Sequence, residues 1–145
     1  MIPNFDENNN LPVGIHSATW QEICDRYGYT VYRRKLLEGL KQGLLDLKSV
    51  GCEIAYLDGS FVTSKERPED FDVCYKDDDV FLDALWFHFP TLYEFGGKTQ
   101  KGKYSGEFFP ASAYAKERMN FLKFFQNDKY TDEKKGIIAI NLLEL

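Results

Sequence analysis

The pair Gly59-Ser60, followed after nine residues by Asp70-Phe71-Asp72-Val73, constrains this chain more than any other feature of its sequence. The apolar run at residues 53–57 predicts a short buried strand that leads into the Gly-Ser turn, and residues 70–75 predict the next strand. Because side chains alternate between the two faces of a strand, Asp70 and Asp72 are expected on one face, with Phe71 and Val73 toward the core.

This arrangement of a small turn and two carboxylates suits a metal–nucleotide site. Two carboxylates that lie two residues apart on one face of a strand repel each other unless a cation lies between them. Mg²⁺ is the expected cation, because it takes a few carboxylates together with substrate phosphate oxygens. Gly59 allows the backbone to approach a phosphate closely, and Ser60 adds a hydroxyl at the start of an expected helical turn. We therefore expect Asp70 and Asp72 to bind Mg²⁺ and the Gly-Ser turn to bind a nucleoside triphosphate.

The rest of the pattern predicts one α/β or α+β domain over residues 1–145, with a mixed sheet and flanking helices. Residues 1–16, rich in Asn, Pro and Gly, are expected to form an extended lead-in. Helices are expected at residues 20–27, 32–49 and 113–126, and either a helix or a packed aromatic connector at 80–89 that ends at Pro90. Residues 104–109 and 136–142 are expected to be strands, and the Gly- and Lys-rich residues 96–103 a linker.

Composition narrows the class of protein. Hydrophobic residues make up 43% and aromatic residues 16% of the chain, which is enough for a folded core. The net charge of −5 disfavours a general nucleic-acid-binding protein, although it leaves an RNA acceptor open. The N-terminus has no secretory signal pattern, and no apolar run is long enough for a membrane span, so we expect a cytoplasmic protein that makes no membrane contact. Three widely spaced cysteines predict reduced thiols.

The same motif resembles that of the DNA polymerase beta-like nucleotidyltransferases. Their core has a hydrophobic residue, Gly and Gly or Ser, followed after about nine to thirteen residues by Asp-hydrophobic-(Asp/Glu)-hydrophobic, which residues 59–60 and 70–73 match. The whole chain also resembles a small bacterial family of nucleotidyltransferase-like proteins, through residues 57–63, 103–107 and 135–138. The resemblance implies a minimal nucleotidyltransferase-like domain in which Asp70 and Asp72 are catalytic metal ligands.

The resemblance also implies a third carboxylate on a later strand. Glu107, in the middle of an expected strand, is the candidate for this third catalytic metal ligand, and Asn141 on the last strand is the competing position. Asp58 departs from the pattern, since an apolar residue is usual before the Gly; it either faces solvent or helps the metal site.

Several basic residues and both histidines allow two interpretations. Lys65 and Arg67 lie between the turn and Asp70, where they would reach a triphosphate; the alternative is a solvated charged loop. The lysines at positions 98, 101 and 103 either close over a nucleotide or lie on a surface loop. His16 and His88 stand alone, which favours core or surface histidines over metal ligands.

Two functions are expected. The first is a Mg²⁺-dependent nucleotidyltransferase that transfers a nucleoside monophosphate from a nucleoside triphosphate to a protein or RNA acceptor. Small members of the superfamily include antitoxins that modify a partner toxin, so the resemblance implies a toxin–antitoxin or defence setting with a cognate toxin as partner. The alternative is an inactive nucleotidyltransferase-fold module that binds a nucleotide or a protein partner.

Overall fold

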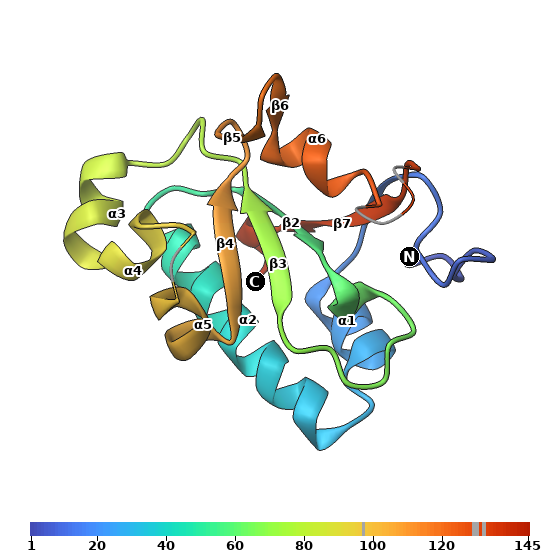
Figure 1. The fold of residues 1–145 in the computed structure, drawn as a ribbon. Helices are drawn as coiled ribbons and strands as arrows, with labels where there is room; N and C mark the ends of the chain where they lie inside the picture. The colour runs from blue at the N-terminus through green and yellow to red at the C-terminus, as the bar shows by residue number, and fades with distance from the viewer. Residues whose placement is uncertain (97, 129–130, 132) are drawn as a thin grey trace.

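Within the described residues, five strands form one mixed sheet in the order β1-β7-β2-β3-β4 (Figure 1). The computed structural model describes residues 1–96, 98–128, 131 and 133–145. The strands of the sheet are β1 (Gly14–Ser17), β2 (Ile54–Asp58), β3 (Phe71–Tyr75), β4 (Gly106–Pro110) and β7 (Gly136–Asn141). β2 is antiparallel to both of its neighbours, whereas β1 runs parallel to β7 and β4 parallel to β3. The expected mixed α+β fold is confirmed.

Helices and a small hairpin surround this sheet. The α-helices are α1 (Trp20–Tyr27), α2 (Val31–Ser49), α3 (Leu82–His88), α4 (Pro90–Tyr93), α5 (Thr99–Tyr104) and α6 (Phe121–Phe125). Two 3₁₀ turns, η1 (Ser60–Val62) and η2 (Leu142–Glu144), follow β2 and β7. The hairpin consists of β5 (Tyr114–Lys116) and β6 (Met119–Asn120).

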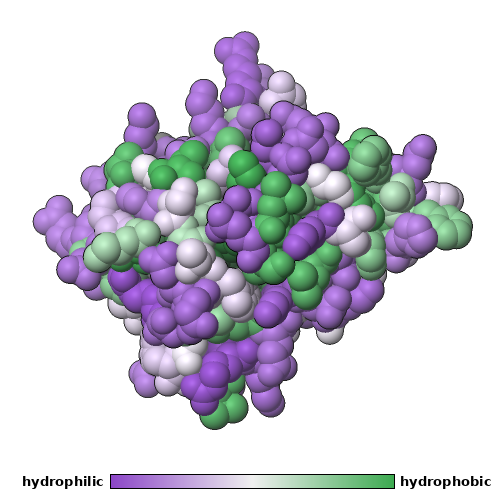
Figure 2. Space-filling model, turned by 180° about the vertical axis from the view of Figure 1, so that it is seen from behind, coloured by the Kyte–Doolittle hydropathy of each residue, from purple (hydrophilic) through white to green (hydrophobic). Residues whose placement is uncertain are grey.

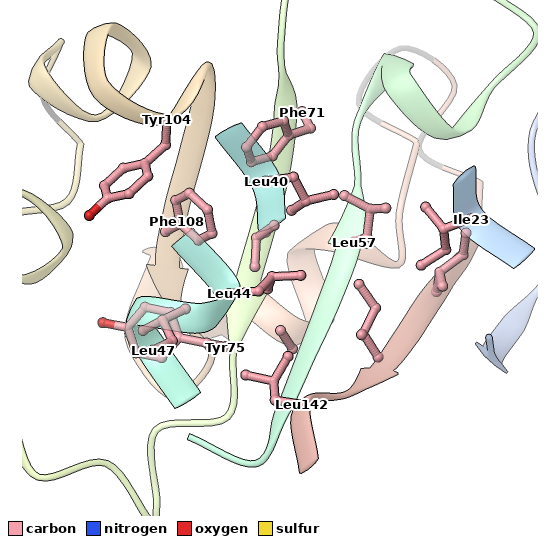
Figure 3. Packing of buried hydrophobic residues seen from close by; sticks show 14 of the residues in the cluster. Ile23, Leu40, Leu44, Leu47, Leu57, Phe71, Tyr75, Tyr104, Phe108 and Leu142 are labelled. Carbon is pink, nitrogen blue, oxygen red and sulfur yellow. The ribbon is translucent and has the colours of Figure 1, made fainter. Parts of the chain in front are cut away.

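The main core lies between α2 and one face of the sheet. Leu40, Leu44 and Leu47 recur at helical spacing on α2 and are fully buried. They point toward apolar side chains of the strands, among them Leu57 and Phe108, as Figure 3 shows. Burial of a leucine side chain contributes about 1.5–3 kcal/mol, so this stripe is a principal source of stability for the fold.

The opposite face of the sheet carries a smaller apolar cluster and, beyond it, the candidate site. Cys74, Ala111, Phe125 and Ile137 form this second cluster. α6 packs over it, and the Phe121 ring stacks on that of Phe109 with the centroids 4.3 Å apart. Because Cys74 and Asp72 are two residues apart on β3, the Asp72 side chain belongs to this second face.

Three expectations about local structure are corrected. Residues 113–126 form a hairpin and the short helix α6 in place of one long helix, because Arg118 has a positive φ of 61° and Asn120 caps a new helix. The expected linker contains α5, while Gly97 lies outside the described residues. The expected lead-in ends inside the sheet, where Gly14 begins β1.

Two further boundaries differ from expectation. Pro90 begins α4, because a proline is well suited to the first turn of a helix. Tyr104 belongs to the end of α5, and the left-handed Ser105 separates it from β4.

The outer surface is mainly polar on the side opposite to the view of Figure 1. Hydrophilic residues cover most of this face, with groups of hydrophobic residues between them (Figure 2). Across the described ranges, no helix combines the length and apolar character that a membrane crossing requires.

Candidate functional site

Three carboxylates lie side by side across three neighbouring strands. In the strand register, Asp58 of β2 is the partner of Asp72 of β3, and Asp72 is in turn the partner of Glu107 of β4. Directly paired residues project from the same face of a sheet, so we call Asp58, Asp72 and Glu107 the acidic row. Asp70 stands two residues before Asp72, immediately ahead of β3. The pairing thus places Glu107 and Asp58 on either side of Asp72, with Asp70 two residues away, and Asp58 is buried and does not face solvent.

A lysine lies at each end of the acidic row. At one end, Lys101 Nζ is 3.0 Å from Asp70 Oδ2 and 3.2 Å from Glu107 Oε1. At the other end, Lys135 Nζ is 2.6 Å from Asp58 Oδ1, and both of these side chains are largely buried. Hydrogen bonds and charge from Asp70 and Glu107 raise the pKa of Lys101, so its ammonium stays charged at neutral pH.

The middle carboxylate, that of Asp72, has no hydrogen bond or ion pair within the part of the chain that the structure describes. Burial raises its pKa to about 7, and the charges of Asp70, Asp58 and Glu107 act in the same direction. Lys135 opposes this shift only in part. The two lysines therefore offset only part of the repulsion among these carboxylates.

The Gly-Ser turn lies directly against Asp72. Gly59 has a φ of +91°, and a Cβ added there would be 2.9 Å from Asp72 Oδ2. Only glycine allows both this backbone conformation and this close approach. Ser60 begins the single 3₁₀ turn η1, and its carbonyl accepts the amide and hydroxyl protons of Thr63.

Arg33 of α2, which the sequence analysis did not single out, holds the segment that follows the turn. Its buried guanidinium donates to the carbonyls of Phe61 at 2.9 Å and Thr63 at 3.4 Å, and also to that of Lys65. A sequence signal was present, because Arg33 continues the leucine stripe of α2 at the spacing that places Leu37 on the same face. The buried arginine thus positions the turn.

These elements line a cavity of about 660 Å³. One part of its wall contains Gly59, Ser60, Lys65, Asp70 and Asp72. Asp58 of the acidic row and its partner Lys135 also line the cavity. Other parts of the wall come from the N-terminal segment and from the end of α6: Asn8, Asn9, Asn10, Phe124, Phe125, Asn127 and Asp128.

The remaining candidates lie elsewhere. Arg67 stacks on the ring of Tyr32, 4.0 Å from its centroid, and is not among the described residues that line the cavity. Asn141 pairs with Ile54 at the end of the sheet away from Asp58, and its side chain accepts the amide proton of Leu143. Asn141 is therefore not part of the site.

Both histidines also lie apart from the acidic row. His16 Nε2 is 2.7 Å from the carbonyl oxygen of Pro12. His88 packs between the rings of Phe87 and Phe89. Lys103 lies over the ring of Tyr104, so of the lysines on α5 it is Lys101 that reaches the carboxylates.

The carboxylates of the site suit Mg²⁺ only when a further ligand binds the ion together with them. In the described ranges, no three His, Cys, Asp or Glu side chains are gathered as ligands of one metal ion. Lys101 already occupies the space between Asp70 and Glu107. Two carboxylates plus substrate phosphates are, however, an ordinary environment for Mg²⁺, and Asp70 and Asp72 share the cavity wall with the Gly-Ser turn. The residues thus suit a metal that is bound jointly with a phosphate ligand.

The fold and the site together define a small mixed α+β protein with a carboxylate-lined cavity at one end of its sheet. The chain belongs to a family described as "Family of unknown function (DUF6932)", whose model matches residues 3–141. No curated protein and no solved structure matches the chain.

Proposed function

We propose that this protein is a nucleotidyltransferase that uses Mg²⁺ and transfers a nucleoside monophosphate from a nucleoside triphosphate to a protein or RNA acceptor. The observation that supports this proposal is the shared cavity wall of Gly59, Ser60, Asp70 and Asp72. A small turn beside two carboxylates provides one place for phosphate and one for a cation, which is the arrangement expected from the sequence.

In this proposal each residue has a defined task. Asp70 and Asp72 hold Mg²⁺, which when bound withdraws charge from the phosphate oxygens. Gly59 and Ser60 hold the triphosphate close to the backbone, and Lys65 on the same wall attracts it electrostatically. An acceptor hydroxyl oxygen attacks the α-phosphorus, the bond to the bridging oxygen breaks, pyrophosphate leaves, and the hydroxyl proton passes to solvent. Positioning for in-line attack is the main contribution of the protein.

The biological setting that we propose depends on the resemblance to small nucleotidyltransferases. By that resemblance the protein acts in the bacterial cytoplasm as a toxin–antitoxin or defence component, and a cognate toxin is its protein partner. The acceptor would then be the toxin itself or an RNA.

A second candidate function is a module that binds a nucleotide or a protein partner without catalysis. The observation that favours it is the pairing of the carboxylates with lysines. Lys101 contacts Asp70 and Glu107, so Glu107 is engaged by a protein cation. A protein that has no further use for a metal ion can retain such pairs for stability alone.

Incubation with each labelled nucleoside triphosphate and Mg²⁺, with and without the protein encoded beside it, distinguishes the two functions. We expect label to be incorporated by the wild type and lost in Asp70→Asn/Asp72→Asn. The matched control is Asp78→Asn/Asp79→Asn, the same charge change in the exposed turn after β3. Equal incorporation in both double variants would contradict the assignment of Asp70 and Asp72. Nucleotide binding without incorporation would favour the second candidate.

A further inference from the structure

The position of Lys101 is determined by its neighbour in the sequence. Gln100 is fully buried, and its side-chain amide bonds both backbone groups of Phe108 on the outer edge of β4. Phe108 N donates to Gln100 Oε1 at 2.8 Å, and Gln100 Nε2 donates to Phe108 O at 3.2 Å. Gln100 Nε2 also donates to the carbonyl of Leu92 at 3.3 Å. Gln100 therefore fastens α5 to β4, which holds Lys101 beside the acidic row.

Although Gln100 holds α5 in place, the Lys101 ammonium can move away from Asp70 and Glu107. Its side chain is 50% exposed, whereas those of Asp70 and Glu107 are 22% and 21% exposed. A lysine side chain is a point charge on a flexible four-carbon stem, so it exchanges partners without a change of backbone. Asp70, which it contacts, is also a residue of the cavity wall. The ammonium thus lies at the border of the proposed nucleotide site.

We propose that Lys101 acts as a displaceable internal cation, so that a divalent metal binds tightly to Asp70 only together with a nucleoside triphosphate. This inference depends on the proposed function. A metal ion alone has to remove Lys101 from Asp70 and then remains close to a positive charge. A triphosphate removes this obstacle, because its oxygens bind both the metal ion and the released ammonium. Lys101 is a positioning residue in this sense, and it selects the metal–nucleotide complex over the free metal.

The coupling between metal binding and nucleotide binding must be reciprocal. If the nucleotide raises the affinity for the metal ion, the metal ion raises the affinity for the nucleotide by the same factor. Without Lys101, the metal ion should bind to the empty carboxylates in the absence of nucleotide, and the coupling factor should fall. The coupling that remains should then come from the direct coordination of the metal ion by the triphosphate oxygens.

The test measures Mn²⁺ binding without nucleotide, by the loss of the free-ion electron paramagnetic resonance signal. We expect Lys101→Met to bind Mn²⁺ about tenfold more tightly than the wild type, a factor that corresponds to about 1.4 kcal/mol. Lys101→Arg keeps the charge and should stay within about twofold of the wild type. Lys103→Met makes the same charge change on α5 without touching the acidic row, and it should also stay within about twofold. Circular dichroism verifies that each variant is folded.

An unchanged Mn²⁺ affinity in Lys101→Met, or an equal gain in Lys103→Met, would overturn the inference. The proposed function is tested separately, by titrating the wild type with fluorescent nucleoside triphosphates in the presence of Mn²⁺. An absence of nucleotide binding there would refute the proposed function, whereas the comparison of the variants with Mn²⁺ alone would still decide whether Lys101 competes with a metal ion.

Discussion

Lys135 Nζ lies 2.6 Å from Asp58 Oδ1, and the two side chains are only 15% and 7% exposed. Burial raises the pKa of Asp58 even though Lys135 opposes the shift. A buried pair of this kind adds little stability compared with apolar residues, but the loss of one partner leaves an uncompensated charge. The pair therefore holds the start of β7 against the end of β2, and Lys135 partly offsets the effect of burial on Asp58.

The first prediction concerns this pair. Lys135→Met should lower the free energy of unfolding by about 2–4 kcal/mol at pH 8, because the buried Asp58 carboxyl group then loses the cation that offsets its burial. Asp58→Asn/Lys135→Met should recover most of the loss, since it removes both charges. Urea denaturation of the three proteins gives these differences. A Lys135→Met protein as stable as the wild type at pH 8 would show that the pair makes no contribution to the free energy of unfolding.

The second prediction follows from the raised pKa of Asp72. Its folded value is about 7 against 3.8 for the ordinary group, so the folded state binds more protons between these values. The contribution of Asp72 to stability therefore falls as the pH rises from about 4 to 7. Asp72→Asn should be about 1–3 kcal/mol more stable than the wild type at pH 8 and nearly equal to it near pH 4.

Urea titrations of both proteins at the two pH values test this difference, with the exposed Asp78→Asn as the control. A stabilising effect of Asp72→Asn that is the same at both pH values would contradict the electrostatic explanation. The loss of the proposed activity in a more stable variant would be the usual trade between function and stability at an active site.

The third prediction concerns the turn. Gly59→Ala should cost about 1–3 kcal/mol, because alanine is strained at a φ of +91° and its methyl group would press on the Asp72 carboxylate. Gly102→Ala is the matched control, since a Cβ there meets no atom within 4 Å and the residue lies in α5. The control should be neutral or slightly stabilising. Thermal unfolding of the two variants measures the contrast, and equal losses would argue against a special role of Gly59.

The fourth prediction concerns Arg33. Arg33→Met should destabilise the protein by about 2–4 kcal/mol, because the carbonyls of Phe61 and Thr63 lose their buried donor. Amide hydrogen exchange should increase mainly in residues 61–65, where these carbonyls lie. Arg34→Met is the control, since Arg34 is exposed and its guanidinium bonds only the carbonyl of Gly28 among the described residues. Faster exchange over the whole chain, without a local maximum, would contradict a positioning role.

Periodic elements were predictable because their own residues determine them. The leucine spacing of α2 and the capping box at Thr19 of α1 are local patterns, and both helices form where expected. α5 and the β5–β6 hairpin were missed for the opposite reason. α5 depends on the buried contacts of Gln100 with β4, and such contacts between separated segments leave little trace in a short stretch of sequence.

The sequence by itself determined the Gly-Ser turn, the strand that carries Asp72 and the neighbouring Asp70, because turn chemistry and strand alternation are local properties. Only the tertiary structure decided that Asp58 and Glu107 flank Asp72 and that Lys101 and Lys135 end the row. Those relationships depend on strand order and register, which are set by packing across the whole sheet. The same packing gives Asp72 its raised pKa, since burial and three neighbouring charges act on it together.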